Sequence, residues 1–263
     1  MFTTYFKMAH HPFSEELPVE RFLKDERITQ GLARLEYFAK EGRIALITGT
    51  TGVGKSSLIR LFVHHLSRHL FQPVYLYLTH VKTTGLLNLI VSGLGEMPKR
   101  GKDRLFLQIL EKTKKTELTT LLIIDEAQLM QPESLTDLRL LVSSVIGEKP
   151  ALKILLSGQE TLRDQLKQAA RADFVNRICV RYHMPPLSKE QTVAYLDYQL
   201  RLAGASEKIF EPEAKQLIHD YAGGIPRDIN NIATACLINA ATRNLQKIND
   251  HLVNETMVEF HLP

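Results

Sequence analysis

Residues 49–56, which read Gly-Thr-Thr-Gly-Val-Gly-Lys-Ser, match the phosphate-binding pattern Gly-x4-Gly-Lys-Ser at every fixed position. Glycines in this loop allow backbone conformations in which successive N–H groups point at phosphate oxygens. The ammonium of Lys55 then reaches the β- and γ-phosphates, and the hydroxyl of Ser56 is a ligand for Mg²⁺. The expected nucleotide-binding residues are Gly49, Thr50, Thr51, Gly52, Val53, Gly54, Lys55, Ser56 and Ser57.

Two carboxylates, Asp125 and Glu126, directly follow the apolar run 121–124. Ligands of open α/β sheets bind at the carboxyl ends of strands, so Asp125 is expected to face the phosphate loop and hold Mg²⁺. Glu126 would then orient and deprotonate the attacking water. Acidic residues at a strand end also cap helices, but together with the phosphate loop this pair predicts hydrolysis of a nucleoside triphosphate.

Polar residues also end a strand expected over 152–156, and either Ser157 or Gln159 is a candidate sensor of the γ-phosphate. A helix cap by Ser157 or a plain turn is the alternative. Three arginines follow, any of which is a candidate finger that stabilises charge during phosphoryl transfer in a neighbouring subunit. They are Arg171, Arg177 and Arg181.

Arg227 comes directly after Gly-Gly-Ile-Pro, residues 223–226, where one helix is expected to end and another to begin. An arginine at this helix start can swing onto a nucleotide. The alternative is a solvent-facing side chain, which would place a cation at the unfavourable end of the helix dipole.

The elements that must position these groups alternate between strand and helix up to residue 184. Strands are expected over 43–48, 73–79, 121–124, 152–156 and 177–183, with helices over 26–41, from the phosphate loop to about 70, 84–94, 134–146 and within 160–176. This alternation predicts a mainly parallel sheet with helices on both faces.

Beyond the Pro185-Pro186 pair, only helices are expected, over 188–203, 211–222, 227–244 and after Asn249. We therefore predict an α/β nucleotide-binding domain over 1–184 and a helical lid domain over 185–263. The aromatic segment 1–25 is assigned to the first domain. It is expected either to cover the nucleotide base or simply to pack into the core.

Positive charge is concentrated in the first part of the chain: residues 1–115 hold 18 Lys and Arg against 10 Asp and Glu. The window 82–115 alone holds eight Lys and Arg against three Asp and Glu. This distribution suits a polyanionic partner, although a solvated surface explains it as well. The candidate DNA-binding residues are Lys82, Lys99, Arg100, Lys102 and Arg104.

No run approaches the roughly 18 apolar residues that a membrane span requires, and the first residues lack the pattern of a secretory signal. A cytoplasmic protein without a membrane partner is expected.

The motifs together resemble the AAA+ superfamily over nearly the whole chain. At a finer level, the aromatic start with Pro12-Phe13, residues 125–128 (Asp-Glu-Ala-Gln), Gly158-Gln159, the segment 177–187 and residues 224–230 resemble ATPases of the general secretion pathway protein A type. That group includes short ATPases encoded beside transposases, similar in role to the ATPase regulators of bacteriophage Mu and cut-and-paste transposons.

The resemblance implies an α/β fold with a five-stranded sheet ordered 5-1-4-3-2, a helical lid, and ATP with Mg²⁺ as cofactors. It also implies ATP-dependent assembly into rings or filaments, with nucleotide at the interface between subunits. Lys55 and Ser56 take the Walker A roles, and Asp125 and Glu126 the Walker B roles. Ser157 or Gln159 takes the sensor one role, Arg227 the sensor two role, and Arg177 best matches the finger.

Two functions are compatible with the resemblance. One is an ATPase that oligomerises on duplex DNA and regulates a transposase or its choice of target site. The other is a secretion-pathway ATPase that assists assembly of envelope machinery, whose relatives are expected to continue into a membrane helix and a cell-wall-binding domain. A third interpretation, a nucleotide-gated binding module that barely hydrolyses ATP, is disfavoured by Glu126.

Overall fold

The computed structural model describes residues 1–14, 17–144 and 151–260, and it divides into two compact units. The α/β unit comprises residues 26–49 and 55–184, and the helical unit comprises residues 1–25, 50–54 and 185–263. Each unit has its own buried apolar cluster.

Five strands form the sheet of the α/β unit, and every pairing between them is parallel. Their order is β2-β3-β4-β1-β5, so the predicted order and strand direction are confirmed. The strands are β1 (Ile44–Thr48), β2 (Phe71–Tyr77), β3 (Thr119–Asp125), β4 (Leu152–Gly158) and β5 (Ile178–His183).

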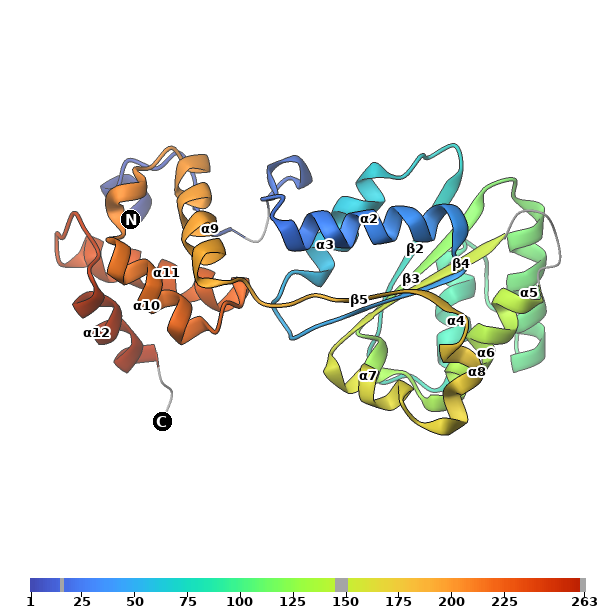
Figure 1. Ribbon diagram of the computed structural model, residues 1–263. Coiled ribbons are helices and arrows are strands. Elements are labelled where there is room, and N and C mark those ends of the chain that lie inside the picture. Colours follow the sequence, from blue (N-terminus) through green and yellow to red (C-terminus); the bar gives the residue numbers. More distant parts are fainter. Residues whose placement is uncertain (15–16, 145–150, 261–263) are drawn as a thin grey trace. The chain divides into compact units, whose positions relative to one another are not determined.

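Helices cover both faces of this sheet, with α2 and α3 on one face and α4, α6 and α7 on the other (Figure 1). Such crossovers are what allow neighbouring strands to run parallel. The helices are α2 (Glu26–Glu41), α3 (Lys55–His65), α4 (Thr83–Gly93), α5 (Lys102–Lys115), α6 (Pro132–Ser143), α7 (Glu160–Leu166) and α8 (Ala172–Val175).

The position of each strand in the sheet explains its sequence pattern. The inner strands β1 and β4 are buried at every residue, as expected for strands covered on both faces. The edge strands β2 and β5 alternate between buried and exposed residues. The strand expected over 73–79 is therefore only half buried, and it exposes Tyr75 and Tyr77.

Several helix boundaries differ from those expected. The helix after the phosphate loop ends at His65 rather than near residue 70, and the predicted end at Ile146 lies outside the described residues. The sequence patterns assigned no helix to 102–115, where α5 forms. Its buried positions Leu105, Ile109 and Thr113 recur every four residues, but the polar, turn-rich interval at its start obscures this repeat.

The helical unit packs helices from both ends of the chain around one apolar cluster. These helices are α1 (Phe2–Tyr5), α9 (Lys189–Leu202), α10 (Pro212–Ala222), α11 (Pro226–Thr242) and α12 (Asp250–Phe260). The N-terminal segment belongs to this unit and not to the α/β domain to which the sequence assigned it. Phe2, Phe6 and Phe13 are buried in the apolar cluster of this unit, and α1 packs against α11.

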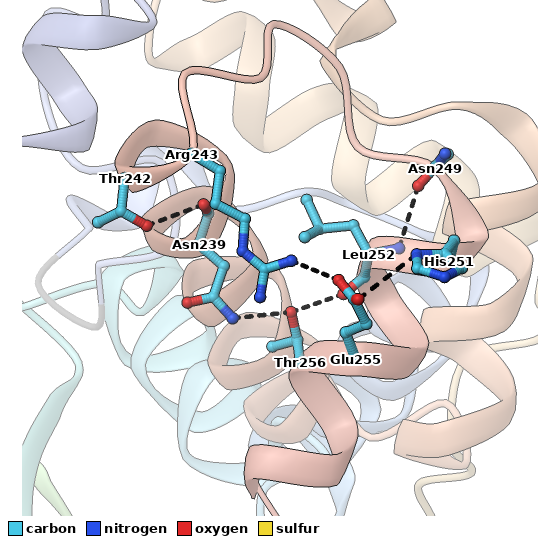
Figure 2. Close-up of polar contacts among 8 residues, drawn as sticks. All are labelled: Asn239, Thr242, Arg243, Asn249, His251, Leu252, Glu255 and Thr256. Atoms are coloured by element: carbon cyan, nitrogen blue, oxygen red, sulfur yellow. Dashed lines mark hydrogen bonds and ion pairs between the residues drawn. The ribbon is translucent and has the colours of Figure 1, made fainter.

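Polar contacts tie α11 to α12 (Figure 2). The amide of Asn239 donates to the Thr256 hydroxyl at 3.0 Å, and Arg243 forms an ion pair with Glu255. The Asn249 side chain accepts the backbone N–H of Leu252 at 3.0 Å and so caps the first turn of α12. The apolar face of α12 is thereby held against the helical core.

A buried lysine donates hydrogen bonds to the C-terminal turn of α2. Lys153, on β4, is 2% exposed, and its ammonium donates to the carbonyls of Phe38, Ala39 and Lys40. Burial lowers the pKa of Lys153 from its usual value. The last carbonyls of a helix generally lack a donor from a following turn, although Phe38 here also accepts the N–H of Gly42 at 2.9 Å. The lysine therefore fixes α2 to the central part of the sheet.

Replacing Lys153 with Met is expected to lower the free energy of unfolding by about 2–4 kcal/mol, because buried carbonyls lose their donor. Urea unfolding followed by circular dichroism measures this change. Lys40→Met is the matched control, since Lys40 is exposed on the same helix end. Equal unfolding midpoints for the two variants would contradict the capping role.

Candidate nucleotide site

The phosphate loop connects the end of β1 to the start of α3. Gly52 and Gly54 have φ angles of 81° and 109°, a region that residues with a Cβ rarely adopt. The side chain of Lys55 is buried, and its ammonium donates to the carbonyl of Gly49 at 2.8 Å. The lysine therefore bonds back to the first residue of the loop. The first turn of α3 follows the loop, so the positive end of the helix dipole lies there.

Asp125 lies at the end of β3 and is 1% exposed. One of its oxygens, Oδ2, accepts hydrogen bonds from the hydroxyls of Ser56, at 3.0 Å, and Tyr75. The other, Oδ1, accepts the backbone N–H of Glu126 at 3.0 Å. The structure therefore joins the two residues that the sequence proposed as metal ligands, Ser56 and Asp125.

This donor set fits Mg²⁺. Hydroxyl and carboxylate oxygens are its preferred ligands, and Mg²⁺ is usually held by one or two carboxylates together with phosphate oxygens. Within the described residues no group of three or more His, Cys, Asp or Glu side chains is arranged to hold a metal by itself. A metal at Ser56 and Asp125 would depend on the nucleotide for its remaining ligands.

Glu126 has an unusual backbone conformation at the end of β3, with a φ of 54°. Non-glycine residues in this left-handed region are uncommon and are often found at functional sites. The carboxylate oxygen Oε2 accepts hydrogen bonds from the amides of Gln128, at 2.5 Å, and Gln159, at 3.3 Å. Gln159 comes from the end of β4, so the register of the sheet brings the two strand ends together.

The two candidate sensors have different surroundings. Ser157 is fully buried, and its hydroxyl has no hydrogen-bond partner among the described residues. Gln159 is partly exposed and contacts Glu126 directly. Of the pair, Gln159 is the residue that shares the site with the two carboxylates.

The three candidate finger arginines also differ. Arg171 donates to the carbonyl of Gln165, and Arg181 donates to the carbonyl of Val175 at 2.8 Å. Arg177 is exposed, and within the described part of the chain its guanidinium makes no hydrogen bond or ion pair. It is therefore the arginine of the three that is available to another molecule.

Arg227 contacts the phosphate loop within the helical unit, which includes residues 50–54. Its backbone N–H donates to the carbonyl of Gly52 at 3.3 Å. A Cβ at Gly52 would lie 2.8 Å from the Cβ of Arg227, so the loop needs glycine here for space as well as for its φ angle.

Part of this chain matches a known domain family, and its fold is similar to that of solved structures. Residues 39–166, which include the phosphate loop, both carboxylates and the end of β4, match the AAA domain family. This match covers just under half of the chain and supports an ATPase activity; we call the site within it the AAA site.

General secretion pathway protein A of Aeromonas hydrophila is 32% identical to this chain over 255 residues. The match covers 94% of this chain and 46% of the relative, so the chain spans less than half of that protein's length. Cdc6p from Pyrobaculum aerophilum has a TM-score of 0.73 at 18% identity, over 96% of this chain and 72% of that chain. The Aeropyrum pernix ORC1 protein in complex with DNA has a TM-score of 0.73 at 17% identity, over 97% and 69% of the two chains.

The sequence did not single out Tyr75, which lies beside the AAA site. Burial and the hydrogen bond to Asp125 raise the pKa of Tyr75 above its usual value, so the phenol stays protonated and remains a donor. The alternation of β2 predicts that Tyr75 and Tyr77 share a face. It does not show that one of them reaches a carboxylate on β3, because that depends on the pairing of the two strands.

The five candidate DNA-binding residues are exposed, but they do not form one group. Lys82 precedes α4, whereas the other four lie beyond the far end of that helix, roughly 16 Å away for 11 residues. Lys102 is paired with Asp137 at 2.9 Å. The other three, Lys99, Arg100 and Arg104, are exposed in the segment that runs from the end of α4 into the first turn of α5, which we call the basic loop.

Replacing Tyr75 with Phe is expected to raise the Mg²⁺ concentration needed for half-maximal nucleotide binding by about tenfold, because the hydroxyl that orients Asp125 is lost. Fluorescent nucleotide binding during a Mg²⁺ titration measures this shift. Tyr77→Phe is the control, since Tyr77 lies two residues further along the same strand and is more exposed. A shift of equal size in both variants would show that Tyr75 has no special role.

Proposed function

We propose that this protein is an ATPase that binds duplex DNA in its ATP-bound form, assembles there with further copies of itself, and regulates a transposase or its target-site choice. The observation that carries the proposal is the basic loop, a fixed group of exposed cations on the same AAA domain as the ATP site. One protein of similar fold, the Aeropyrum pernix ORC1 protein, was solved in complex with DNA.

The basic loop is held in place by contacts within the α/β unit. Gln108, on α5, is 7% exposed; its amide donates to the carbonyl of Met97 at 2.9 Å and accepts the N–H of Lys99 at 3.2 Å. Lys112 forms an ion pair with Glu96 at 2.8 Å. Because the backbone is fixed, Lys99 and its neighbour Arg100 lose less conformational entropy when they bind phosphates.

The AAA site supports hydrolysis through residues that the structure brings together. We assign phosphate binding to the loop 49–57 with Lys55, metal ligation to Ser56 and Asp125, and activation of water to Glu126. Bound Mg²⁺ would neutralise charge that develops on the phosphates. Gln159 is our choice for sensor one and Arg227 for sensor two, the latter because its backbone contacts Gly52.

Self-assembly is proposed because the finger arginine is expected to act between subunits. Arg177 is exposed at the start of β5, and the guanidiniums of the two other candidates are hydrogen-bonded to backbone carbonyls of their own subunit. An exposed arginine can stabilise charge on a neighbour's nucleotide. Nucleotide at such an interface would couple ATP binding to growth of a ring or filament.

The secretion-pathway function is the alternative, and the observation that favours it is the 32% identity with general secretion pathway protein A. Among the described residues, each helix is too short or too polar to cross a bilayer. Recovery of the native protein with the membrane fraction, together with no DNA binding at low salt, would favour this alternative.

Replacing Lys99 and Arg100 together with Ala is expected to weaken ATP-dependent binding to duplex DNA by at least about tenfold near 0.1 M salt. It should also reduce the slope of log affinity against log salt by about two, because two phosphate contacts no longer release counterions. Fluorescence anisotropy with labelled duplex DNA and a non-hydrolysable ATP analogue, at several salt concentrations, measures both quantities.

The control for this experiment is Lys114→Ala with Lys115→Ala, which removes the same charge from the other end of α5. Equal losses in the two double variants would indicate a general charge effect rather than a site. No retention of the unaltered protein on duplex DNA at low salt would refute the proposed function.

Replacing Arg177 with Ala is expected to lower ATP hydrolysis by about 10³-fold, and Glu126→Gln should lower it for a different reason. Mixing the two inactive proteins should restore activity, because the Glu126→Gln subunits supply an intact Arg177 to their neighbours. Arg181→Ala, whose side chain is bonded within its own subunit, is the control and should stay active. A mixture no more active than its components would argue against a finger acting between subunits.

A further inference from the structure

Gln128 lies in the short 3-10 turn Ala127–Leu129 that follows the Walker B carboxylates, and its side-chain amide bridges two parts of the site. The amide nitrogen donates to Oε2 of Glu126, and the amide oxygen accepts the backbone N–H of Gln159 at 3.1 Å. One side chain therefore joins the end of β3 to the end of β4.

The orientation of this amide follows from the chemistry of its partners. A backbone N–H can only donate, so the oxygen of Gln128 must face Gln159. The NH₂ group must then face Glu126, whose ionised carboxylate can only accept. Neither partner tolerates the flipped amide, so the hydrogen bonds fix one side-chain orientation.

Two further contacts hold Gln128 in place. The amide of Gln165, on α7, donates to the backbone carbonyl of Gln128 at 3.1 Å. Gly158 leaves the space that the side chain occupies, since a Cβ at that position would lie 2.8 Å from the amide oxygen of Gln128. The bridge is thus supported from β4 and from α7.

We propose that Gln128 is a positioning residue for ATP hydrolysis, one that sets the place of Glu126 relative to the γ-phosphate sensor Gln159. Both amide donors are directed to Oε2 of Glu126, which leaves Oε1 for the attacking water. Misplacing a catalytic group by about 1 Å can cost about 100-fold in rate. This role rests on ATP hydrolysis by the AAA site and does not depend on DNA binding or on a transposase.

Gln128→Glu is the sharpest test because it keeps the size of the side chain and the acceptor for Gln159. It replaces the donor that faces Glu126 with a second carboxylate oxygen. We expect kcat for ATP hydrolysis to fall by about 100-fold, while KM for ATP and the affinity for a fluorescent ATP analogue stay within about threefold. Gln131→Glu, the same chemical change at an exposed position three residues later, should leave both constants unchanged.

A melting-temperature cycle tests the contact without measuring hydrolysis. Gln128→Glu places two carboxylates together and should lower the melting temperature by about 2–4 °C. In the Glu126→Gln background the polarity of the pair is only reversed, because the new amide at position 126 donates to the new carboxylate at position 128. Gln128→Glu should then no longer lower the melting temperature.

Equal losses of melting temperature in the two backgrounds, or a raised KM with an unchanged kcat, would overturn the role of Gln128. A wild-type protein that binds ATP without turnover would instead count against the hydrolysis that the proposed function requires. In that case the melting temperatures would still show whether Gln128 contacts Glu126. Failure of the Gln128 role and failure of the proposed ATPase function can therefore be told apart.

Discussion

Parallel pairing of β1, β3 and β4 is the constraint on which the site depends. Their register brings the phosphate loop after Thr48, the carboxylate of Asp125 and the backbone of Gly158 to the same edge of the sheet. Parallel strands require crossover helices, and those helices bury the sheet on both faces. The same strand topology consequently produces the apolar core and places the site residues at one edge of the sheet.

The buried carboxylate of Asp125 determines which polar groups gather at this edge of the sheet. A carboxylate that is 1% exposed must be compensated by hydrogen bonds or by a cation. Here two hydroxyls and one backbone N–H supply the hydrogen bonds. A metal that bound at Ser56 and Asp125 would enter a set of oxygens already brought together by the fold, which is the preorganisation that hydrolytic sites require.

The helical unit contributes in a different way. Its core includes aromatic residues from the N-terminal segment, which pack with helices that lie more than 170 residues later in the chain. The same unit includes residues 50–54, where Gly52 accepts the N–H of Arg227. Part of the phosphate loop is therefore supported by helices that carry none of the Walker A or Walker B residues.

Much of the AAA site was predictable from the sequence because its signals are local. Spacing within residues 49–56 indicates a phosphate loop wherever the loop lies in the fold, and an apolar run before Asp125 indicates a strand end. Alternating strands and helices predict a parallel sheet, and the resemblance to AAA+ proteins supplied the strand order.

Contacts between distant strands and segments could be decided only by the tertiary structure. Tyr75 reaches Asp125 through the pairing of β2 with β3, and Gln128 reaches Gln159 through the turn that follows β3 and the end of β4. The N-terminal segment packs with the helical unit because its aromatic residues fit that core, a matter of shape that composition does not reveal. Side-chain contacts across strands depend on register and rotamer, and neither is encoded in local spacing.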